Sequence, residues 1–476
     1  MQEIHDAPAL RRVLHFFEEI SKIPRRSFIT APIADYLCRF AEARGLFHLR
    51  DKADNVIIRK AASKDAKSEK TLILQAHTDM VFAKADPNAV FDENEGLTLL
   101  REGDFLYANG TTLGADDGIG MAYILAILDD AALSHPTIEA IFTSNEEVGL
   151  LGATALAGDA ITGDMLINLD SDEEGIFTAG CAGGSTATLT LPMKREGEMH
   201  CFTLSLCGLP GGHSGADIHK GIANAILLLA SMLDEIGKAS PIRLASIDGG
   251  EASNAIPTFA SATFSCDADP EKIDKICKLI LTIENDFVGD AKISLQESKA
   301  SACMNETESA ALIRAILAMP RGILAMDKNL KTIPETSLNL GKIETTDADL
   351  MLSFALRSSV DESRKALEKK MAECAEAIGG SALIDGIYPA WEYAENSPLR
   401  EACVSVYRNE YKREPTVSII HAGLECGIFA EKRPGLDSIS FGPNNKNIHT
   451  PDERLSLSSA ARVYDYLVCL LAELAK

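Results

Sequence analysis

The sequence predicts an α/β protein with a doubly wound, mostly parallel sheet and an inserted α+β domain. Within residues 1–185, short buried-strand runs alternate with amphipathic helices, which is typical of crossover connections between parallel strands. Within residues 186–395 the strand runs become more alternating or mixed, which favours an antiparallel sheet with helices. The first pattern returns in residues 396–476. We therefore expect one discontinuous domain, 1–185 and 396–476, into which the domain 186–395 is inserted.

In the first part of the chain, apolar residues at helical spacing and short β-rich runs predict the elements in order. The expected helices cover residues 8–22, 30–44 and 117–128, and the expected strands cover residues 55–59, 71–76, 137–143 and 165–169. Pro24 breaks the helical pattern of the first helix. The run AGCAGGS at 179–185 predicts a turn that closes this part of the domain.

The insert and the tail follow the same rules. In the insert the expected strands cover 201–207, 258–266, 292–296 and 352–356, and the expected helices cover 216–235, 270–288, 308–318 and 361–378. The tail contains the expected helices 398–411 and 457–475 and the expected strands 416–420 and 437–440. The insert is long enough for two similar α+β units, but no convincing internal repeat marks them.

The composition is ordinary for a globular protein, and the charge limits its partners. Hydrophobic residues make up 46% and charged residues 24% of the 476 residues. Asp and Glu number 70 against 46 Lys and Arg, so the net charge of −24 repels nucleic acid and anionic membranes. Apolar stretches such as 225–233 are too short to span a bilayer. We therefore expect no nucleic-acid partner and no membrane partner.

The N-terminus and the cysteines predict a cytoplasmic location. Residues 1–20 contain no continuous apolar run and no small-residue cleavage site, so we expect no signal peptide. The eleven cysteines are scattered from Cys38 to Cys469 without a Cys-x-x-Cys motif, which favours reduced thiols over a disulfide framework. Cys201 and Cys207 could meet, although two buried strand cysteines are the simpler interpretation.

Five segments place acids or histidines at the ends of expected strands, where open α/β sheets bind their ligands. The first is LILQAHTDM, in which His77 ends a strand and Asp79 lies on the same side. The carboxylate of Asp79 could accept the second imidazole N–H of His77 and fix the tautomer of the ring. In isolation, the pair is also compatible with an ordinary core or surface histidine.

The next two segments contain adjacent acids. Asp116 and Asp117 lie in a glycine-rich turn before an apolar helix, which indicates either a metal-binding loop or an ordinary helix N-terminus. Glu146 and Glu147 end the next strand, and neighbouring carboxylates there need a cation or a proton nearby. Because adjacent side chains diverge, one could bind a metal while the other faces a substrate as a base. The alternative is the first turn of a helix.

The last two segments add one donor each. Asp170 ends a buried strand, and the acids that follow it indicate a solvated turn. His449 follows a strand and a turn near the C-terminus, and alone it would be an ordinary loop histidine. Histidine and carboxylate donors without thiolates suit zinc, or manganese or cobalt in its place. Because one zinc needs about four ligands, five donors with one shared carboxylate indicate two metals about 3.5–4 Å apart.

A series of short motifs runs in order through nearly the whole chain. It comprises FFEEISKIPRRS, AHTDM, LGADDGIGMA, SNEEVGLLGA, INLDSDEEG, CAGG, GLPGGHSGADIHKGIANA, ASNAIP, LRSSVD, HAGLECGIF and HTPDERL. The series resembles the M20 family of metallopeptidases, and within it the bacterial aminoacyl-histidine (Xaa-His) dipeptidases. The resemblance implies a zinc-peptidase-like catalytic domain, 1–185 and 396–476, and identifies the insert 186–395 as a lid domain.

The resemblance also implies roles for residues of the catalytic domain. The implied metal ligands are His77, Asp116, Glu147, Asp170 and His449. Asp116 would bridge the two metals and would be followed by a cis peptide. Asp79 would support His77 from behind, and Glu146 would be the general base. The implied cofactors are two Zn²⁺ ions per chain, with Mn²⁺ or Co²⁺ as alternatives.

The resemblance implies substrate contacts in the lid. His213 in GGHSGADIH would meet the substrate carbonyl oxygen, with His219 as the second choice for this role. For both histidines the alternative is an exposed loop before the next helix. Arg357 would bind the terminal carboxylate of the substrate with two parallel N–H groups of its guanidinium. The alternative interpretation of Arg357 is an ordinary surface arginine. Asn254 and Gly423 match further substrate-contacting positions.

The activity implied by the resemblance is metal-dependent hydrolysis of dipeptides, either Xaa-His dipeptides such as carnosine or a broader range. Other M20 amidohydrolases, namely aminoacylases, deacetylases and carboxypeptidases, share the metal centre and are the nearest alternatives. A metal-binding scaffold without turnover is a further alternative, although Glu146 and all five ligand candidates are present. The expected partner is a small peptide, and this branch of the family allows a homodimer through the lid.

Overall fold

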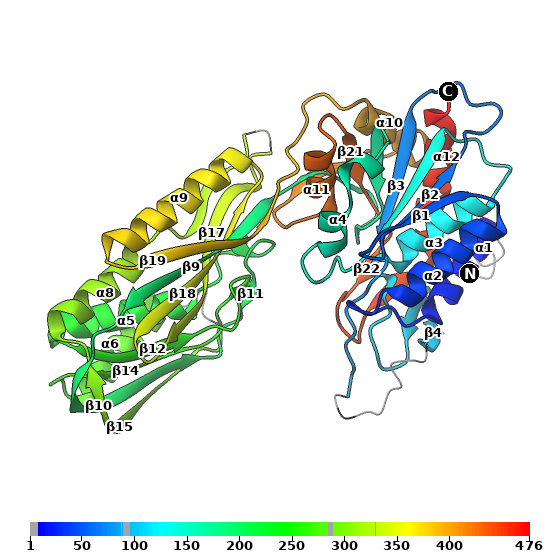
Figure 1. The fold of residues 1–476 in the computed structure, drawn as a ribbon. Helices are drawn as coiled ribbons and strands as arrows, with labels where there is room; N and C mark the ends of the chain where they lie inside the picture. The colour runs from blue at the N-terminus through cyan, green and yellow to red at the C-terminus, as the bar shows by residue number, and fades with distance from the viewer. Residues whose placement is uncertain (1–7, 87, 89–95, 284–288, 329) are drawn as a thin grey trace. The chain divides into compact units, whose positions relative to one another are not determined.

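The computed structural model divides the chain into two compact units (Figure 1). Unit 1 comprises residues 1–181, 393–419 and 424–476, and unit 2 comprises residues 182–392 and 420–423. The structure describes residues 8–86, 88, 96–283, 289–328 and 330–476. Unit 2 is thus inserted into unit 1, and a four-residue segment of the tail also belongs to it.

Unit 1 is built on an eight-stranded sheet with the order β1–β2–β6–β3–β7–β21–β8–β20. Its strands are β1 (Phe47–Arg50), β2 (Val56–Lys60), β3 (Thr71–His77), β6 (Thr137–Thr143), β7 (Met165–Asn168), β8 (Ile176–Cys181), β20 (Thr416–Ile420) and β21 (Asp437–Ser440). The central strands β6, β3, β7 and β21 pair in parallel, whereas β1 with β2, β2 with β6, and β21 with β8 pair antiparallel. The expected α/β class with a parallel sheet is therefore confirmed, with antiparallel pairs toward the edges.

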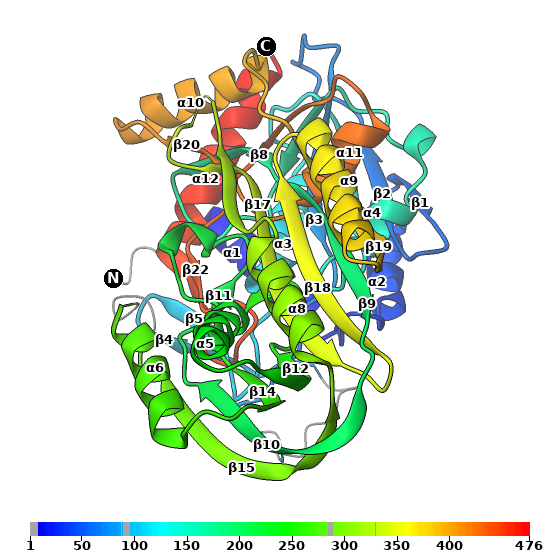
Figure 2. The same cartoon turned by 90° about the vertical axis from the view of Figure 1, so that its left-hand side faces the viewer.

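Helices cover both faces of this sheet (Figures 1 and 2). One face carries α1 (Pro8–Ser21), α2 (Ala31–Ala43), α3 (Ala115–Asp129) and α12 (Leu457–Leu474), and the other carries α4 (Leu151–Ala155) and α11 (Glu425–Lys432). A further helix, α10 (Pro398–Tyr411), packs against α12. Because α3 packs against β3 on one side and against α1 and α12 on others, it is apolar and buried all round.

A small second sheet joins the C-terminal segment to the first part of the chain. Its order is β22–β23–β5–β4, with strands β4 (Leu99–Glu102), β5 (Phe105–Ala108), β22 (Asn445–Lys446) and β23 (Arg454–Ser456). β23 pairs antiparallel with both β22 and β5. The loop between β22 and β23, which contains His449, is therefore held against the body of unit 1.

Unit 2 contains a nine-stranded sheet with the order β15–β10–β14–β12–β17–β18–β9–β19, and β16 pairs with β17. Its strands are β9 (Gly183–Pro192), β10 (Glu196–Cys207), β12 (Arg243–Gly249), β14 (Ala260–Ser265), β15 (Lys292–Cys303), β16 (Gly322–Met326), β17 (Pro334–Thr345), β18 (Asp349–Ser358) and β19 (Ser381–Tyr388). Four helices, α5 (Ala225–Ala239), α6 (Pro270–Ile283), α8 (Glu306–Ala318) and α9 (Asp361–Ala377), lie on one face of it (Figure 2). The pairs of this sheet are antiparallel, which confirms the expected α+β class. A separate short pair joins β11 (Gly212–His213) to β13 (Ala255–Ile256).

The expected turn at 179–185 is wrong, because this run ends β8 and begins β9. Small residues are typical of turns, but they also allow another part of the chain to approach a strand closely. A Cβ on Gly184 would overlap the hydroxyl of Tyr388, and a Cβ on Gly183 would lie 2.5 Å from the backbone nitrogen of Ala390. The two glycines therefore make room for the segment 388–390.

The expected helix 216–235 begins too early. In the structure α5 begins at Ala225, and a separate 3-10 turn covers residues 218–220. The side chain of Asn224 fixes the start of α5 by accepting hydrogen bonds from the backbone N–H groups of Ile226 and Leu227. The expected helix 270–288 corresponds to α6, and its part beyond Ile283 lies outside the described residues.

The cysteines are all free, and the pairing considered for Cys201 and Cys207 is wrong. Both lie on β10, six residues apart, which is about 20 Å along an extended strand. Cys207 is exposed, whereas the Sγ of Cys201 lies 3.7 Å from the Sγ of Cys303 on the neighbouring strand β15. In the described part of the chain, none of the helices has the length and hydropathy needed to cross a bilayer.

Candidate metal centre

Six acids and histidines predicted from the sequence converge at one place in unit 1. His77 ends β3, Asp170 follows β7 by two residues, Asp116 lies in the first turn of α3, Glu146 and Glu147 lie between β6 and α4, and His449 lies between β22 and β23. They form three overlapping groups that could hold a metal ion: His77 with Asp116 and Asp170; Asp116 with Glu147 and His449; and His77 with Glu146 and Glu147. Within each group the donor atoms lie within 4.8 Å of one another.

The two glutamates do not end a strand, contrary to expectation. β6 ends at Thr143, and Asn145 in the following loop has a positive φ of 51°. The first turn of α4 does not contain them either, because α4 begins at Leu151. Adjacent side chains of a regular strand point to opposite faces, whereas this loop brings the carboxylates of both Glu146 and Glu147 close to the same His77.

Asp116 faces two histidines with different oxygens. Its Oδ1 lies 2.9 Å from Nε2 of His77, and its Oδ2 lies 3.0 Å from Nε2 of His449. Ligands of Zn²⁺ lie about 2.0–2.2 Å from the ion, so two ligands of one ion are about 3–3.5 Å apart. The carboxylate is therefore placed to give one oxygen to each of two ions. The peptide between Asp116 and Asp117 is cis, in agreement with the resemblance.

Asp79 faces His77 with both its backbone carbonyl and its carboxylate. Nδ1 of His77 lies 3.1 Å from the backbone carbonyl oxygen of Asp79 and 3.6 Å from its carboxylate. An Nδ1–H donated to this carbonyl leaves the lone pair of Nε2 free for a metal. The carboxylate of Asp79 also accepts hydrogen bonds from Ser27 Oγ at 2.8 Å and from the backbone N–H of Glu146 at 2.9 Å. Asp79 thus joins the loop that carries Glu146 to the end of β3.

Burial and mutual repulsion shift the pKa values of the cluster. Burial raises the pKa of Glu146 and of Asp170 well above the ordinary range. Burial alone would lower the pKa of His77, but the nearby carboxylates of Asp170 and Asp116 raise it well above the ordinary value. Hydrogen bonds to Asp116 and Glu147 raise the pKa of His449 to about 10. So many buried acids need cations beside them.

The donor set fits two zinc-like ions. It contains imidazole nitrogens and carboxylate oxygens without thiolates, and the carboxylates of Asp116 and Glu147 each belong to two of the three groups of donors. Oε1 of Glu147 is buried and has no hydrogen-bond partner among the residues that the structure describes. A buried acceptor without a donor is rare in folded proteins, and an ion beside Glu147 would satisfy it.

Unit 2 contains a second polar cluster, centred on Arg357 at the end of β18. Arg357 is 7% exposed, and its Nη1 donates a hydrogen bond to the hydroxyl of Tyr388 at 2.8 Å. Its guanidinium also lies 3.5 Å from Ser214 Oγ and 3.3 Å from His213 Nε2. None of these three partners carries a negative charge. A buried guanidinium in such surroundings is well suited to bind an anionic group of a ligand.

The surroundings of His213 fix its tautomer. Its Nδ1 accepts hydrogen bonds from the backbone N–H groups of Gly215 at 3.2 Å and Ala216 at 3.0 Å. Burial, followed by the charge of Arg357, lowers the pKa of His213, so the ring is neutral and Nε2 carries the proton. Nε2–H of His213 and Nη2–H of Arg357 are then both donors. Two donors 3.3 Å apart can converge on one oxygen of a ligand.

The other three predicted lid residues lie differently. His219 is exposed on the 3-10 turn 218–220, and the side chain of Asn254 is exposed. Asn254 contacts the cluster through its backbone, because its carbonyl oxygen accepts a hydrogen bond from the N–H of Ser214 at 2.9 Å. A Cβ on Gly423 would lie 2.7 Å from the ring of Tyr388, so Gly423 makes room for this ring.

Sequence reasoning missed Tyr388 and His421 in this cluster. His421 is 5% exposed, and its Nε2 lies 2.7 Å from Ser337 Oγ on β17. His421 is the first residue of the motif HAGLECGIF, from which the sequence analysis names only Gly423 as a substrate contact. The motif could therefore also have indicated His421. Tyr388 lies within the expected insert 186–395 but in none of the motifs, and only the fold reveals that it contacts Arg357.

We expect His421 to make unit 2 less stable in acid. Burial, followed by repulsion from Arg357, lowers the pKa of His421 from 6.5 to about 4. As the pH falls, the unfolded chain takes up the proton first, so the free energy of unfolding decreases between pH 6.5 and pH 4, by about 3 kcal/mol. The variant His421→Gln should lose this slope in urea unfolding measured at pH 7 and pH 4.5. The control His200→Gln, at an exposed position, should keep it, and equal slopes in both variants would contradict the prediction.

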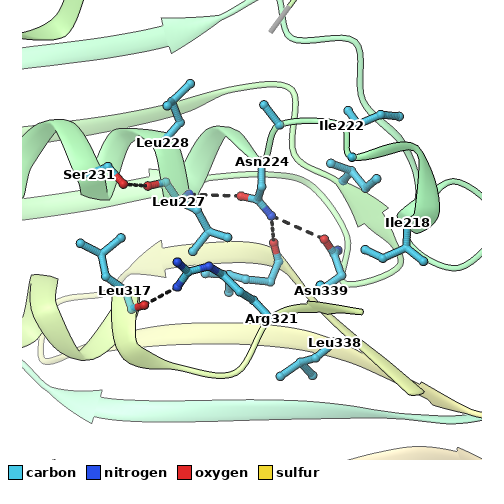
Figure 3. Close-up of a pocket in the computed structure, with 15 residues that line it drawn as sticks. Ile218, Ile222, Asn224, Leu227, Leu228, Ser231, Leu317, Arg321, Leu338 and Asn339 are labelled. Atoms are coloured by element: carbon cyan, nitrogen blue, oxygen red, sulfur yellow. Dashed lines mark hydrogen bonds between the residues drawn. The ribbon is translucent and has the colours of Figure 1, made fainter. Parts of the chain in front are cut away.

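A cavity of about 350 Å³ in unit 2 has a different character (Figure 3). Its lining is mainly apolar and includes none of the cluster residues around Arg357. The polar side chains in it bond within the lining: Asn224 Nδ2 donates to the carbonyl oxygen of Leu340 at 2.8 Å, and Arg321 donates to the carbonyl oxygen of Leu317 (Figure 3). The described residues of its lining include no carboxylate, imidazole or thiol that could act as a base or bind a metal.

Comparisons with known proteins agree with this geometry. The sequence profile of peptidase family M20/M25/M40 matches residues 73–473. The cytosol non-specific dipeptidase of Escherichia coli (strain K12) is 34% identical over 471 residues, which cover 96% of each chain. The crystal structure of the aminoacylhistidine dipeptidase from Vibrio alginolyticus has a TM-score of 0.87 and 33% identity over 99% of both chains. The aminopeptidase PepT from Bacillus cereus, at 19% identity, has a TM-score of 0.62 over 98% of this chain and 99% of its own, and so shares the fold.

Proposed function

Because the chain belongs to peptidase family M20/M25/M40, we propose that it hydrolyses free dipeptides at a dinuclear zinc centre in unit 1. The observation that carries the proposal is the position of Asp116, whose two oxygens lie 2.9 Å and 3.0 Å from two different histidines. The names of the two relatives at 33–34% identity support dipeptides as substrates, Xaa-His dipeptides such as carnosine among them. The E. coli relative is named non-specific, which favours a broad range.

In this proposal each ion has three protein ligands and the two share Asp116. The first ion would be held by His77, Asp116 and Asp170, and the second by Asp116, Glu147 and His449. Zinc bound there would lower the pKa of a water molecule toward neutrality and polarise the carbonyl group of the scissile bond. Mn²⁺ or Co²⁺ could take its place, because the same donors suit them.

Glu146 is proposed as the general base. Its carboxyl group is partly buried and lies within 4.8 Å of donor atoms of His77 and Glu147, so a water molecule that attacks beside these donors would be within its reach. The same group can then give the proton to the amine that leaves. Asp79 holds the backbone of Glu146 through a 2.9 Å hydrogen bond and would keep this base in position.

His213 and Arg357 are proposed to bind the substrate from unit 2. The neutral His213 can donate its Nε2–H to the carbonyl oxygen on which negative charge develops. Arg357 can bind the terminal carboxylate with two parallel N–H groups. A requirement for a free carboxylate would favour short substrates with a free C-terminus. His219, Asn254 and Gly423 stay weaker candidates for substrate contacts.

A substrate panel tests the proposed function. Enzyme stripped with a chelator should be inactive toward carnosine and other dipeptides and should regain activity with Zn²⁺, Mn²⁺ or Co²⁺. Tripeptides and N-acyl amino acids should be cleaved much more slowly. Faster cleavage of N-acyl amino acids would instead indicate an aminoacylase or deacetylase, and release of C-terminal residues from longer peptides would indicate a carboxypeptidase.

Replacing Arg357 by methionine should lower kcat/KM toward dipeptides by about 100-fold, mainly through KM, because a charge-assisted pair to the carboxylate is lost. Activity toward the corresponding dipeptide amides, which lack this carboxylate, should change little. The control Arg321→Met removes an arginine of the same unit, at the cavity of Figure 3, and should leave both activities intact. An equal loss toward dipeptides and amides would show that Arg357 does not bind the carboxylate.

Two further parts of the proposal concern the cell and the assembly. The eleven free cysteines and the E. coli relative, which is named a cytosol enzyme, support a cytoplasmic location. A homodimer through the insert, expected from the resemblance, is proposed as the assembly. Light scattering on the purified chain measures the mass of the particle and tests it.

A further inference from the structure

A buried acid from the C-terminal segment holds the turn that carries Asp116. Glu453 is 2% exposed and lies four residues after His449. Its two carboxylate oxygens accept hydrogen bonds from the backbone N–H groups of residues 113–116, at 2.7, 2.8, 2.9 and 3.3 Å in chain order. The last of these four donors is the N–H of Asp116 itself. A single side chain thus satisfies four consecutive backbone donors at the start of α3.

A buried arginine bonds to a backbone carbonyl group of the same turn. The side chain of Arg25 is fully buried, and its Nη2 donates to the carbonyl oxygen of Gly114. Its Nη1 donates to the carbonyl oxygens of Thr78 at 3.1 Å and Asp79 at 3.0 Å, directly after His77. A Cβ on Gly114 would lie 2.7 Å from Nη2, so glycine leaves the space that the guanidinium needs.

We propose that Glu453 and Arg25 are positioning residues that hold Asp116 between the two histidines. This inference rests on the proposed metal centre and deepens it. Glu453 belongs to the loop of His449, because its N–H donates to the carbonyl oxygen of Thr450 at 3.1 Å. Glu453 therefore bonds both to the turn of Asp116 and to the loop of His449, and it fixes the 3.0 Å distance between Asp116 Oδ2 and His449 Nε2. Arg25 does the same for the 2.9 Å distance between Asp116 Oδ1 and His77 Nε2.

The charges of the two residues explain why neither can be replaced by a neutral side chain. The backbone N–H groups of residues 113–116 all donate to the carboxylate of Glu453. In Glu453→Gln, an NH₂ group would replace one of the accepting oxygens, and it cannot accept a hydrogen bond from these N–H groups. Loss of either charge also leaves the other buried with less compensation. The turn would then move, and Asp116 would move with it. Residues that orient metal ligands typically change metal affinity by about 10–100-fold when they are replaced.

The experiment measures metal binding without any peptide. Zn²⁺ and Co²⁺ affinities are determined by competition with a chromophoric chelator for the wild-type chain and for Glu453→Gln. We expect two ions per wild-type chain, and at least a tenfold loss of affinity for the ion at Asp116, Glu147 and His449 in the variant. Arg25→Lys keeps the charge but removes the guanidinium, whose two terminal nitrogens bond to different parts of the chain. This variant should lower the affinity for the ion at His77 by a similar factor.

The control is Asp437→Asn. Asp437 also holds the start of a helix, since it accepts hydrogen bonds from Ser397 Oγ and the N–H of Leu399 at α10, but it has no bond to the turn of Asp116. It should lower the thermal stability and leave both metal affinities unchanged. Wild-type affinities in Glu453→Gln and Arg25→Lys, or an equal loss of affinity in Asp437→Asn, would overturn the inference. A wild-type chain that binds two ions but cleaves no dipeptide contradicts the proposed function instead, and leaves the inference standing.

Discussion

Replacing Glu146 by alanine is expected to lower kcat toward dipeptides by about 10²–10⁴-fold while both metal ions stay bound. A general base contributes a factor of this size, because the proton of the attacking water must go to another acceptor once the base is removed. KM should change little, since the substrate contacts proposed here lie on other residues. The measurement is steady-state kinetics together with the metal content of the purified variant.

This experiment also decides between two roles of Glu146. Its carboxylate forms one of the three donor groups, with His77 and Glu147, so it could be a metal ligand instead of a base. Loss of one ion from Glu146→Ala would favour the ligand role, and retention of both ions with full activity would exclude both roles. The variant Glu173→Ala removes an exposed acid of the same unit and should have wild-type kinetics and metal content.

Replacing Asp116 by asparagine is expected to have the second large effect. An amide presents only one oxygen, so it cannot give an oxygen to each of two ions as the carboxylate can. We expect at least a 100-fold loss of affinity for one ion, a smaller loss for the other, and a fall in kcat/KM of about 10³-fold. The affinities are measured by competition with a chelator, and the activity is measured at saturating metal.

A matched control for this variant is Asp172→Asn. Asp172 is another largely buried acid near the centre, and burial raises its pKa to about 7, but it belongs to none of the three donor groups. Its replacement should leave the bound ions in place. If Asp116→Asn kept both ions at wild-type affinity, or if Asp172→Asn lost one of them, the proposed bridging role of Asp116 would be wrong.

The fold and the placement of His77 and Asp170 could be predicted because both follow from short-range patterns. The carboxyl ends of neighbouring parallel strands lie at the same edge of a sheet. Residues at the ends of β3 and β7 therefore lie close together for any conformation of the connecting loops. Hydrophobic runs such as 71–76 mark these strands clearly, and His77 and Asp170 come directly after them. Resemblance to a family then added Asp116 and His449, which local patterns left open.

The residues that support the donors could not be predicted, because their contacts join distant parts of the chain. Glu453 lies in the motif HTPDERL, but it bonds to residues that precede it by more than 330 positions, and the motif alone does not reveal these partners. Arg25 follows a helix, in a place where a solvated arginine is equally common. The structural role of some glycines could not be predicted for the same reason. Gly183 and Gly184 indicate a turn by sequence alone, and only the structure shows that they make room for the segment of Tyr388.

The small sheet that carries His449 makes the two halves of the centre unequal. His77 and Asp170 extend from central strands of the large sheet, whereas His449 lies at a positive φ of 63° between two strands of two and three residues. Short peripheral elements open more readily than central strands do. An ion in contact with His449 would therefore exchange with the medium sooner than its neighbour, so that a limited amount of chelator leaves a population with one ion per chain.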